Sequence, residues 1–116
     1  MHVLATRACR ELDRRGLAVD LVTGLAMSTR VSDQSGLSAH SRFTNIAGSM
    51  TVVPGGFEAV LDPVTSLPRP VVIVDDVVTT GATLTEAARA LRAVGLTDVR
   101  ACTIAATRRR FGDADV

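Results

Sequence analysis

The segment 71–83 constrains the fold of this chain more than any other part of the sequence. Residues 71–74 read Val-Val-Ile-Val, and this apolar run predicts a strand of a parallel sheet that is buried on both faces. Two carboxylates, Asp75 and Asp76, follow the run directly. Because ligands of open α/β sheets bind beyond the carboxyl ends of the strands, we expect the acidic pair to face a ligand cleft instead of the core.

The residues that follow the acidic pair predict an anion site. They combine small side chains, hydroxyl groups and backbone N–H groups at the expected start of a helix, where the helix dipole favours a phosphate. The acidic pair would repel a phosphate placed against it, so we expect it to accept hydrogen bonds from sugar hydroxyls or to help hold a divalent cation. A ribose 5-phosphate group meets both requirements. The predicted phosphate-binding residues are Thr79, Thr80, Gly81, Ala82 and Thr83.

The whole segment resembles the phosphoribosyl pyrophosphate (PRPP) loop of the type I phosphoribosyltransferases. That loop has four apolar residues, two acidic residues and then Val-x-Thr-Thr-Gly-x-Thr, and the match is full. The resemblance implies that Asp75 and Asp76 contact the ribose hydroxyls, that residues 79–83 hold the 5-phosphate, and that Mg²⁺ accompanies the pyrophosphate. The full match favours this interpretation over a plainer one, in which the acids only end a strand and Thr83 only caps a helix.

An upstream segment resembles the ComF family, whose members are phosphoribosyltransferase-like and are linked to competence and DNA uptake. Residues 33–38 read Asp-Gln-Ser-Gly-Leu-Ser, and Arg42 and Asn45 follow them. Arg42 and Asn45 lie three residues apart on an expected helix over residues 39–47, so they share one face and are candidates for the ligand cleft. The alternative for this pair is local hydrogen bonding only. The resemblance runs from about His2 to Arg109.

This resemblance implies an α/β, Rossmann-like phosphoribosyltransferase fold with a parallel sheet, formed by residues 1–116 as one domain. ComF proteins normally begin with a zinc-binding module of paired Cys-x-x-Cys motifs, then a pyrophosphate-binding loop and a flexible basic loop. We find none of these here, so we expect the chain to be the C-terminal part of the fold and to be weak or inactive as a transferase. Cys9 and Cys102 lack a Cys-x-x-Cys partner and predict buried small hydrophobes, not a zinc site.

Composition supports a small domain and excludes several kinds of chemistry. The 116 residues are 47% hydrophobic but include only three Phe and no Trp or Tyr, which predicts a modest aliphatic core between a sheet and its helices. All 13 basic residues other than histidine are arginine, and the absence of lysine excludes a Walker-type P-loop and a pyridoxal Schiff base.

The net charge and the hydropathy of the sequence indicate which partners and which cellular compartment to expect. Because the net charge is only +1, we do not expect the chain to bind nucleic acid directly. We find no secretory segment and no apolar run long enough to span a membrane, so we expect a cytoplasmic protein without a membrane partner. The Arg cluster at 108–110 is interpreted as a solvated surface feature.

Periodicity predicts the remaining elements. The first helix is expected to bury Leu4, Ala8 and Leu12 on one face and to stop at Gly16, while Thr83 and Glu86 form a capping-box pattern that opens the helix after the PRPP loop. That second helix would bury a stripe ending before Gly95. The expected elements are a helix at 2–15, a strand at 18–23 with residues 25–30 as its continuation or the entry to a loop, a connector at 51–70 with a short strand at 57–61, a helix from about 83 to 94 and a strand at 99–106. The strand that begins at residue 71, the helix after it and the strand at 99–106 form one βαβ unit.

Three functions follow from the resemblance. The first is transfer of the phosphoribosyl group of PRPP to a nitrogen nucleophile, of the kind used in nucleotide metabolism and salvage. The second is a non-catalytic module that binds PRPP or a nucleotide, and the third is an accessory or regulatory protein of DNA uptake. The partners implied are PRPP or a nucleotide, a second copy of the chain in a homodimer, and a protein of the competence machinery.

Overall fold

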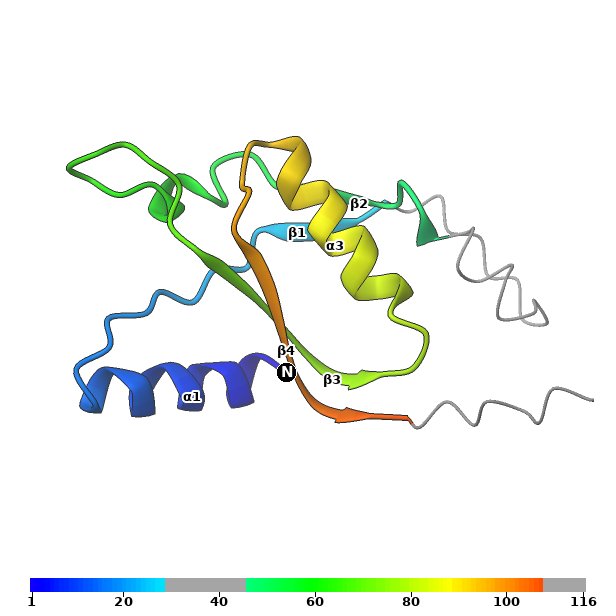
Figure 1. The fold of residues 1–116 in the computed structure, drawn as a ribbon, viewed down its shortest axis with the longest axis horizontal. Coiled ribbons are helices and arrows are strands. Elements are labelled where there is room, and N and C mark those ends of the chain that lie inside the picture. The colour runs from blue at the N-terminus through cyan, green and yellow to red at the C-terminus, as the bar shows by residue number, and fades with distance from the viewer. Residues whose placement is uncertain (29–45, 108–116) are drawn as a thin grey trace, which may run out of the picture.

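The computed structural model describes residues 1–28 and 46–107, and Figure 1 shows how their helices and strands are arranged. Arg42, Asn45 and the Arg cluster at 108–110 lie outside the described residues. The described elements are α1 (His2–Arg14), β1 (Leu25–Met27), β2 (Met50–Val52), a 3₁₀ helix η1 (Glu58–Val60), β3 (Val71–Val78), α3 (Ala82–Ala93) and β4 (Val99–Ala106).

A parallel βαβ unit forms the centre of the fold. Strands β3 and β4 pair in parallel from Val71 opposite Val99 to Val78 opposite Ala106, and α3 connects them. Figure 1 shows α3 beside the crossing of the two strands. The α/β fold with a parallel sheet is therefore confirmed, and the predicted strand at 99–106 has the bounds that the structure gives to β4.

The core lies where α3 meets the strands. Its buried residues form two clusters, and Ile73 of β3 and Leu25 of β1 pack against both of them. The expected apolar stripe of α3 is confirmed, because Leu84 and Ala88 are half-buried and Ala87 and Leu91 are buried. The clusters consist of Met50, Ala87 and Ala90, and of Val60, Leu91 and Leu96.

Strands β1 and β2 form a separate antiparallel pair, with Leu25 opposite Val52 and Met27 opposite Met50. The strand expected at 18–23 is wrong, because these residues have no regular structure and the strand begins at Leu25. The short strand expected at 57–61 is also wrong, since residues 58–60 form η1 and Leu61 makes an isolated β-bridge with Pro68. A β-favouring sequence becomes a strand only where a neighbouring strand pairs with it.

One face of the β3–β4 sheet stays uncovered within the described residues. Side chains alternate between the two faces of a strand, and in β3 Val72 and Val74 are 53% and 43% exposed while Ile73 packs under α3. Ile104 and Cys102 of β4 are exposed as well. The prediction that residues 71–74 are buried on both faces is therefore wrong for the described structure, and so is the prediction of a buried Cys102.

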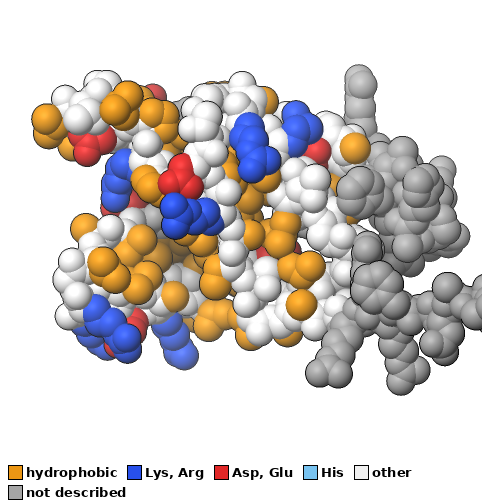
Figure 2. Space-filling view, in the orientation of Figure 1, with side chains coloured by type: hydrophobic (Ala, Val, Ile, Leu, Met, Phe, Trp, Pro, Cys, Tyr) orange, Lys and Arg blue, Asp and Glu red, His pale blue; other side chains and the backbone are white. Residues whose placement is uncertain are grey.

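Helix α1 differs from expectation in the face that it buries. Ala5 is buried and Cys9 and Leu12 are half-buried, whereas Leu4 and Ala8 are exposed. The spacing 5, 9, 12 follows the 3.6-residue period more closely than the expected spacing 4, 8, 12, which drifts around the helix. Figure 2 shows hydrophobic side chains gathered in the lower part of the molecule, where α1 and the strands lie.

The end of α1 has a local cause. Gly16 adopts a positive φ of 79° and its N–H donates to the carbonyl of Asp13 at 2.9 Å, which confirms the predicted stop. Within the described ranges, no helix has both the length and the apolar character needed to cross a membrane.

Candidate functional site

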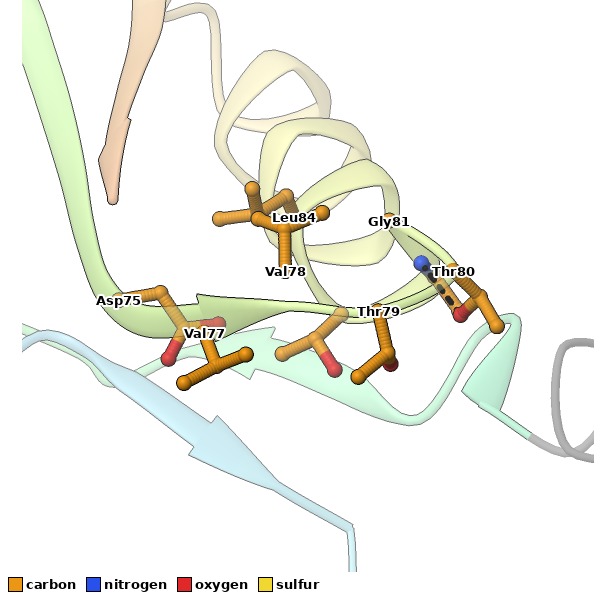
Figure 3. A pocket seen from close by; sticks show the side chains of 9 residues that line it. Asp75, Val77, Val78, Thr79, Thr80, Gly81 and Leu84 are labelled. Carbon is orange, nitrogen blue, oxygen red and sulfur yellow. Dashed lines mark hydrogen bonds between the residues drawn. The ribbon is translucent and has the colours of Figure 1, made fainter. Parts of the chain in front are cut away.

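A pocket lies between the end of β3 and the start of α3 (Figure 3). Its volume of about 200 Å³ includes space open to solvent. The described residues therefore line a small hollow that is open to solvent. The lining consists of Asp75, Val77, Val78, Thr79, Thr80, Gly81, Ala82, Thr83 and Leu84.

All five predicted phosphate-binding residues line this pocket. Strand β3 carries the chain to Val78, so the two acids lie within the strand and not beyond its end as expected. Figure 3 shows Thr79 and Thr80 along the turn that leads from β3 to Gly81 and α3. The turn is short because Gly81 adopts the left-handed conformation, with φ 78° and ψ 3°, and the first helical residue follows it.

The start of α3 contradicts the predicted capping box. Gly81 is the residue that precedes the helix, so Thr83 lies inside the first turn and makes no capping hydrogen bond. Glu86 does not reach back to the helix start, because it bonds to Arg89 and Met50 instead. The hydroxyl of Thr80 takes over part of the capping role, since its Oγ1 accepts the N–H of Ala82 at 3.2 Å (Figure 3).

A run of backbone N–H groups is left without an acceptor around the pocket. The N–H groups of Thr79, Thr80, Gly81 and Thr83 have no hydrogen-bond partner among residues 1–28 and 46–107. The ladder of α3 starts later, with the N–H of Thr85 donating to the carbonyl of Gly81 at 2.9 Å. Unpaired N–H groups at a helix N-terminus attract anions, and the helix dipole adds to the effect.

The acidic pair is divided between the two faces of β3. Asp75 is half-buried and lines the pocket, whereas Asp76 is exposed and lies outside the lining. Adjacent residues of a strand point to opposite faces, which explains the division. In each case one carboxylate oxygen accepts the next backbone N–H, from Asp76 to Asp75 at 2.9 Å and from Val77 to Asp76 at 2.8 Å. The second oxygen of each carboxylate has no partner within the part of the chain that the structure describes.

The described residues contain no group of three or more His, Cys, Asp or Glu side chains that could hold a metal ion. Magnesium in nucleotide sites is commonly held by one or two carboxylates together with phosphate oxygens of the substrate. Asp75 fits that donor set, because it lines the pocket and keeps a carboxylate oxygen without a partner among the described residues, whereas Asp76 lies on the other face of β3.

Comparison with known protein families shows the family of the chain. The model of the phosphoribosyl transferase domain matches residues 3–115, nearly the whole chain. The chain belongs to this family. A search among curated proteins finds no match. A search among solved structures finds none either.

Membership in the phosphoribosyl transferase family supports phosphoribosyl transfer as the general chemistry of the chain, and the resemblance to type I enzymes is confirmed at that level. All pocket residues belong to the matched range, and all except Leu84 belong to the segment 71–83 that carried the resemblance. Arg42 and Asn45 lie outside the described residues, so their place in the cleft stays a prediction.

The sequence interpretation missed an ion pair beside the loop, formed by a buried Glu86 and an Arg89 side chain that is 49% exposed. The Glu86 side chain is only 4% exposed, and it pairs with Arg89 at 2.7 Å. The hydrogen bond from Arg89 is the main reason that the pKa of Glu86 falls from 4.5 to about 2; burial opposes this, and the N–H groups of Gly48 and Met50 reinforce it. One signal was present in the sequence: Glu86 stands midway between Ala82 and Ala90 on the same face of an apolar helix.

Proposed function

We propose that this chain binds PRPP at the β3–α3 loop and transfers its phosphoribosyl group to a nitrogen nucleophile. The observation that carries the proposal is the run of unpartnered N–H groups around a pocket that also contains the Asp75 carboxylate. The N–H groups suit the 5-phosphate, and the carboxylate suits a ribose hydroxyl. Sugar and phosphate are then held at opposite ends of one small site.

In the proposed reaction the nucleophile attacks C1 of PRPP, a C–N bond forms, and pyrophosphate leaves with the electron pair of the broken C–O bond. The transition state has oxocarbenium character. The loop residues fix the position of C1 by holding the 5-phosphate, and Asp75 fixes the ring by accepting a hydrogen bond from a hydroxyl group. Magnesium, when bound with PRPP, offsets the charge that grows on the leaving pyrophosphate.

The geometry supports unequal roles for the acidic pair. We propose Asp75 as the first ribose contact, because it lines the pocket and keeps one carboxylate oxygen free of protein partners. Asp76 lies on the exposed face of β3, and we propose it as a second contact for the ribose hydroxyls or for Mg²⁺. A role in nucleotide salvage belongs to the same proposal.

The narrower resemblance to ComF proteins rests on residues 33–45, which lie outside the described part of the chain. Nothing observed in the described residues favours an accessory role in DNA uptake over phosphoribosyl transfer. The competence partner and the homodimer therefore stay predictions. Binding of PRPP without turnover in the presence of acceptor bases would favour the non-catalytic alternatives.

The proposal is tested by calorimetric titration of PRPP with Mg²⁺ into the chain and into an Asp75→Asn/Asp76→Asn variant. We expect saturable binding by the wild type and a loss of at least tenfold in affinity in the double variant. Asp13→Asn is the matched control, because it removes one carboxylate from the exposed side of α1 and should leave binding unchanged. A folded wild-type chain that binds no PRPP would overturn the proposal.

A further inference from the structure

Glu86 links the helix that carries the loop to a strand that is distant in the sequence. Its Oε1 accepts the backbone N–H of Met50 at 3.0 Å, and Arg89 donates to the backbone carbonyl of Met50, also at 3.0 Å. Glu86, Arg89 and the backbone of Met50 are called the Glu86 clamp below. We propose that Glu86 is a positioning residue that holds α3, and with it the N–H groups of residues 79–83, in the orientation that receives a phosphate. This inference rests on the proposed function.

The chemistry of the clamp indicates that its main effect is on the orientation of α3 and not on stability. Burying the Glu86 carboxylate is no more stabilising than burying a hydrophobic side chain of similar volume, because desolvation of the charge offsets most of its attraction to Arg89, which is itself 49% exposed. Glu86 nevertheless occupies the buried face of α3, where its neighbours one turn away in either direction are the buried Ala82 and Ala90. The described side chains leave no buried polar atom without a partner, so the carboxylate is fully compensated.

The directions of the hydrogen bonds give the clamp an effect that apolar packing lacks. Met50 also packs its side chain against Ala87 and Ala90, but hydrophobic contact is non-directional and permits the helix to slide or turn. The clamp binds both polar backbone groups of one residue from two positions of α3, which fixes the helix along its axis and in rotation. Arg89 suits this task, because its planar fork donates to Glu86 and to the Met50 carbonyl at the same time.

The loop depends on α3 for its orientation. The residue before the helix is Gly81, which has no side chain to cap it, and only the Thr80 hydroxyl and the Gly81 carbonyl bond to the first turns. Glu86 stands one turn beyond Ala82 and is the nearest side chain of α3 that bonds to a distant part of the chain within the described residues. A change in the orientation of the helix start therefore moves the N–H groups that line the pocket.

A merely stabilising role is the rival explanation, and a matched variant separates the two. Glu86→Gln keeps the shape of the side chain but removes its charge and replaces one carboxylate oxygen with an NH2 group, which cannot accept a hydrogen bond from Arg89. Leu96→Ala is the control, because Leu96 is buried in the other cluster and takes no part in the clamp. Both variants are compared at a temperature at which circular dichroism shows that they are folded. Arg89→Lys is a second variant, whose ammonium group cannot bridge two acceptors as a planar fork does.

The first measurement needs no ligand. Hydrogen exchange is followed at the amides of Ala82 and Thr85, which bond to the Thr80 hydroxyl and the Gly81 carbonyl. We expect Glu86→Gln to speed exchange at these two amides at least tenfold more than Leu96→Ala does, and Arg89→Lys to give an intermediate increase. Equal acceleration in Glu86→Gln and Leu96→Ala would overturn the positioning role.

The second measurement uses ribose 5-phosphate as the probe. We expect Glu86→Gln to weaken its binding about tenfold and Leu96→Ala to change it less than twofold. Unchanged affinity in folded Glu86→Gln would overturn the inference. If the wild-type chain binds neither PRPP nor ribose 5-phosphate, the proposed function fails, and the exchange measurement still decides whether Glu86 orients the start of α3.

Discussion

The Glu86 carboxylate and the backbone N–H of Met50 are 3.0 Å apart although 36 residues separate them in the sequence. This contact joins β2 to the helix that follows the loop, and Arg89 completes it through the Met50 carbonyl. The β3–α3 unit that carries the loop and the antiparallel pair β1–β2 are therefore parts of one folded unit, although their strands belong to different sheets.

The stability of this unit should depend on acid pH through Glu86. Its pKa is about 2 in the folded chain against an ordinary value of 4.5, so the native state favours the charged form. A carboxylate with a lowered pKa contributes stability above its unfolded pKa, and this contribution is lost as the pH falls from about 4.5 towards 2. We expect Glu86→Gln to lower the thermal midpoint at pH 7 and the difference from wild type to vanish near pH 2. Melting curves across this range provide the measurement.

The matched control for this experiment is Glu11→Gln. Glu11 also pairs with arginines, Arg14 and Arg15, but all three side chains are exposed. Exposed pairs contribute about 0–1 kcal/mol. A pH dependence in Glu11→Gln as large as in Glu86→Gln would show that general surface charge is responsible, and not the buried Glu86 carboxylate.

Gly81→Ala should impair both stability and ligand binding. An added Cβ meets no atom within 4 Å, so its effect comes from the φ of 78° alone. A left-handed conformation costs a non-glycine residue roughly 1–2 kcal/mol. Gly16→Ala is the control, because Gly16 has a φ of 79° and equally open surroundings at the end of α1. Chemical denaturation should show similar losses of unfolding free energy in the two variants, whereas only Gly81→Ala should weaken PRPP binding. Equal PRPP affinity in both variants would contradict the proposed role of the loop in binding.

Gly24→Ala should destabilise the chain by a different route. A Cβ at this position would lie 2.4 Å from the Phe57 ring, closer than any real contact. Overpacking of this kind costs about 1–3 kcal/mol. Combining Gly24→Ala with Phe57→Leu tests the cause, because the smaller side chain makes room for the methyl group. We expect the double variant to lose less stability than the sum of the single variants, as measured by urea denaturation, and strict additivity would contradict the predicted clash.

Leu91→Ala should cause the largest loss of stability among single core changes. Leu91 is 1% exposed and packs with Val60 and Leu96 beneath the sheet. Truncation of a buried leucine costs about 2–5 kcal/mol through lost burial and the cavity left behind. Leu67→Ala, at an exposed position, should change the unfolding free energy by less than about 0.5 kcal/mol. A similar loss in both variants would show that Leu91 is not part of a packed core.

Local patterns were sufficient for the βαβ unit and for the loop. The apolar run at 99–106 predicts β4 at its observed bounds, and the spacing of Leu84, Ala87 and Leu91 predicts the buried face of α3. The residues 79–83 that line the pocket are contiguous, so their chemistry and their proximity are both readable from the sequence. Such features depend on neighbours within a few residues, and for this reason sequence patterns determine them.

Tertiary structure decided the features that require a partner from elsewhere in the chain. Residues 18–23 have a strand-like composition, yet the strand forms at 25–27 because β2 pairs there. Glu86 fits a capping box by spacing, but the left-handed Gly81 starts the helix earlier and Met50 supplies a distant backbone partner. The sequence by itself determined which local elements form and where a phosphate is expected to bind. Only the folded chain decided how α3 is oriented, because hydrogen bonds between distant segments exist only after those segments have packed together.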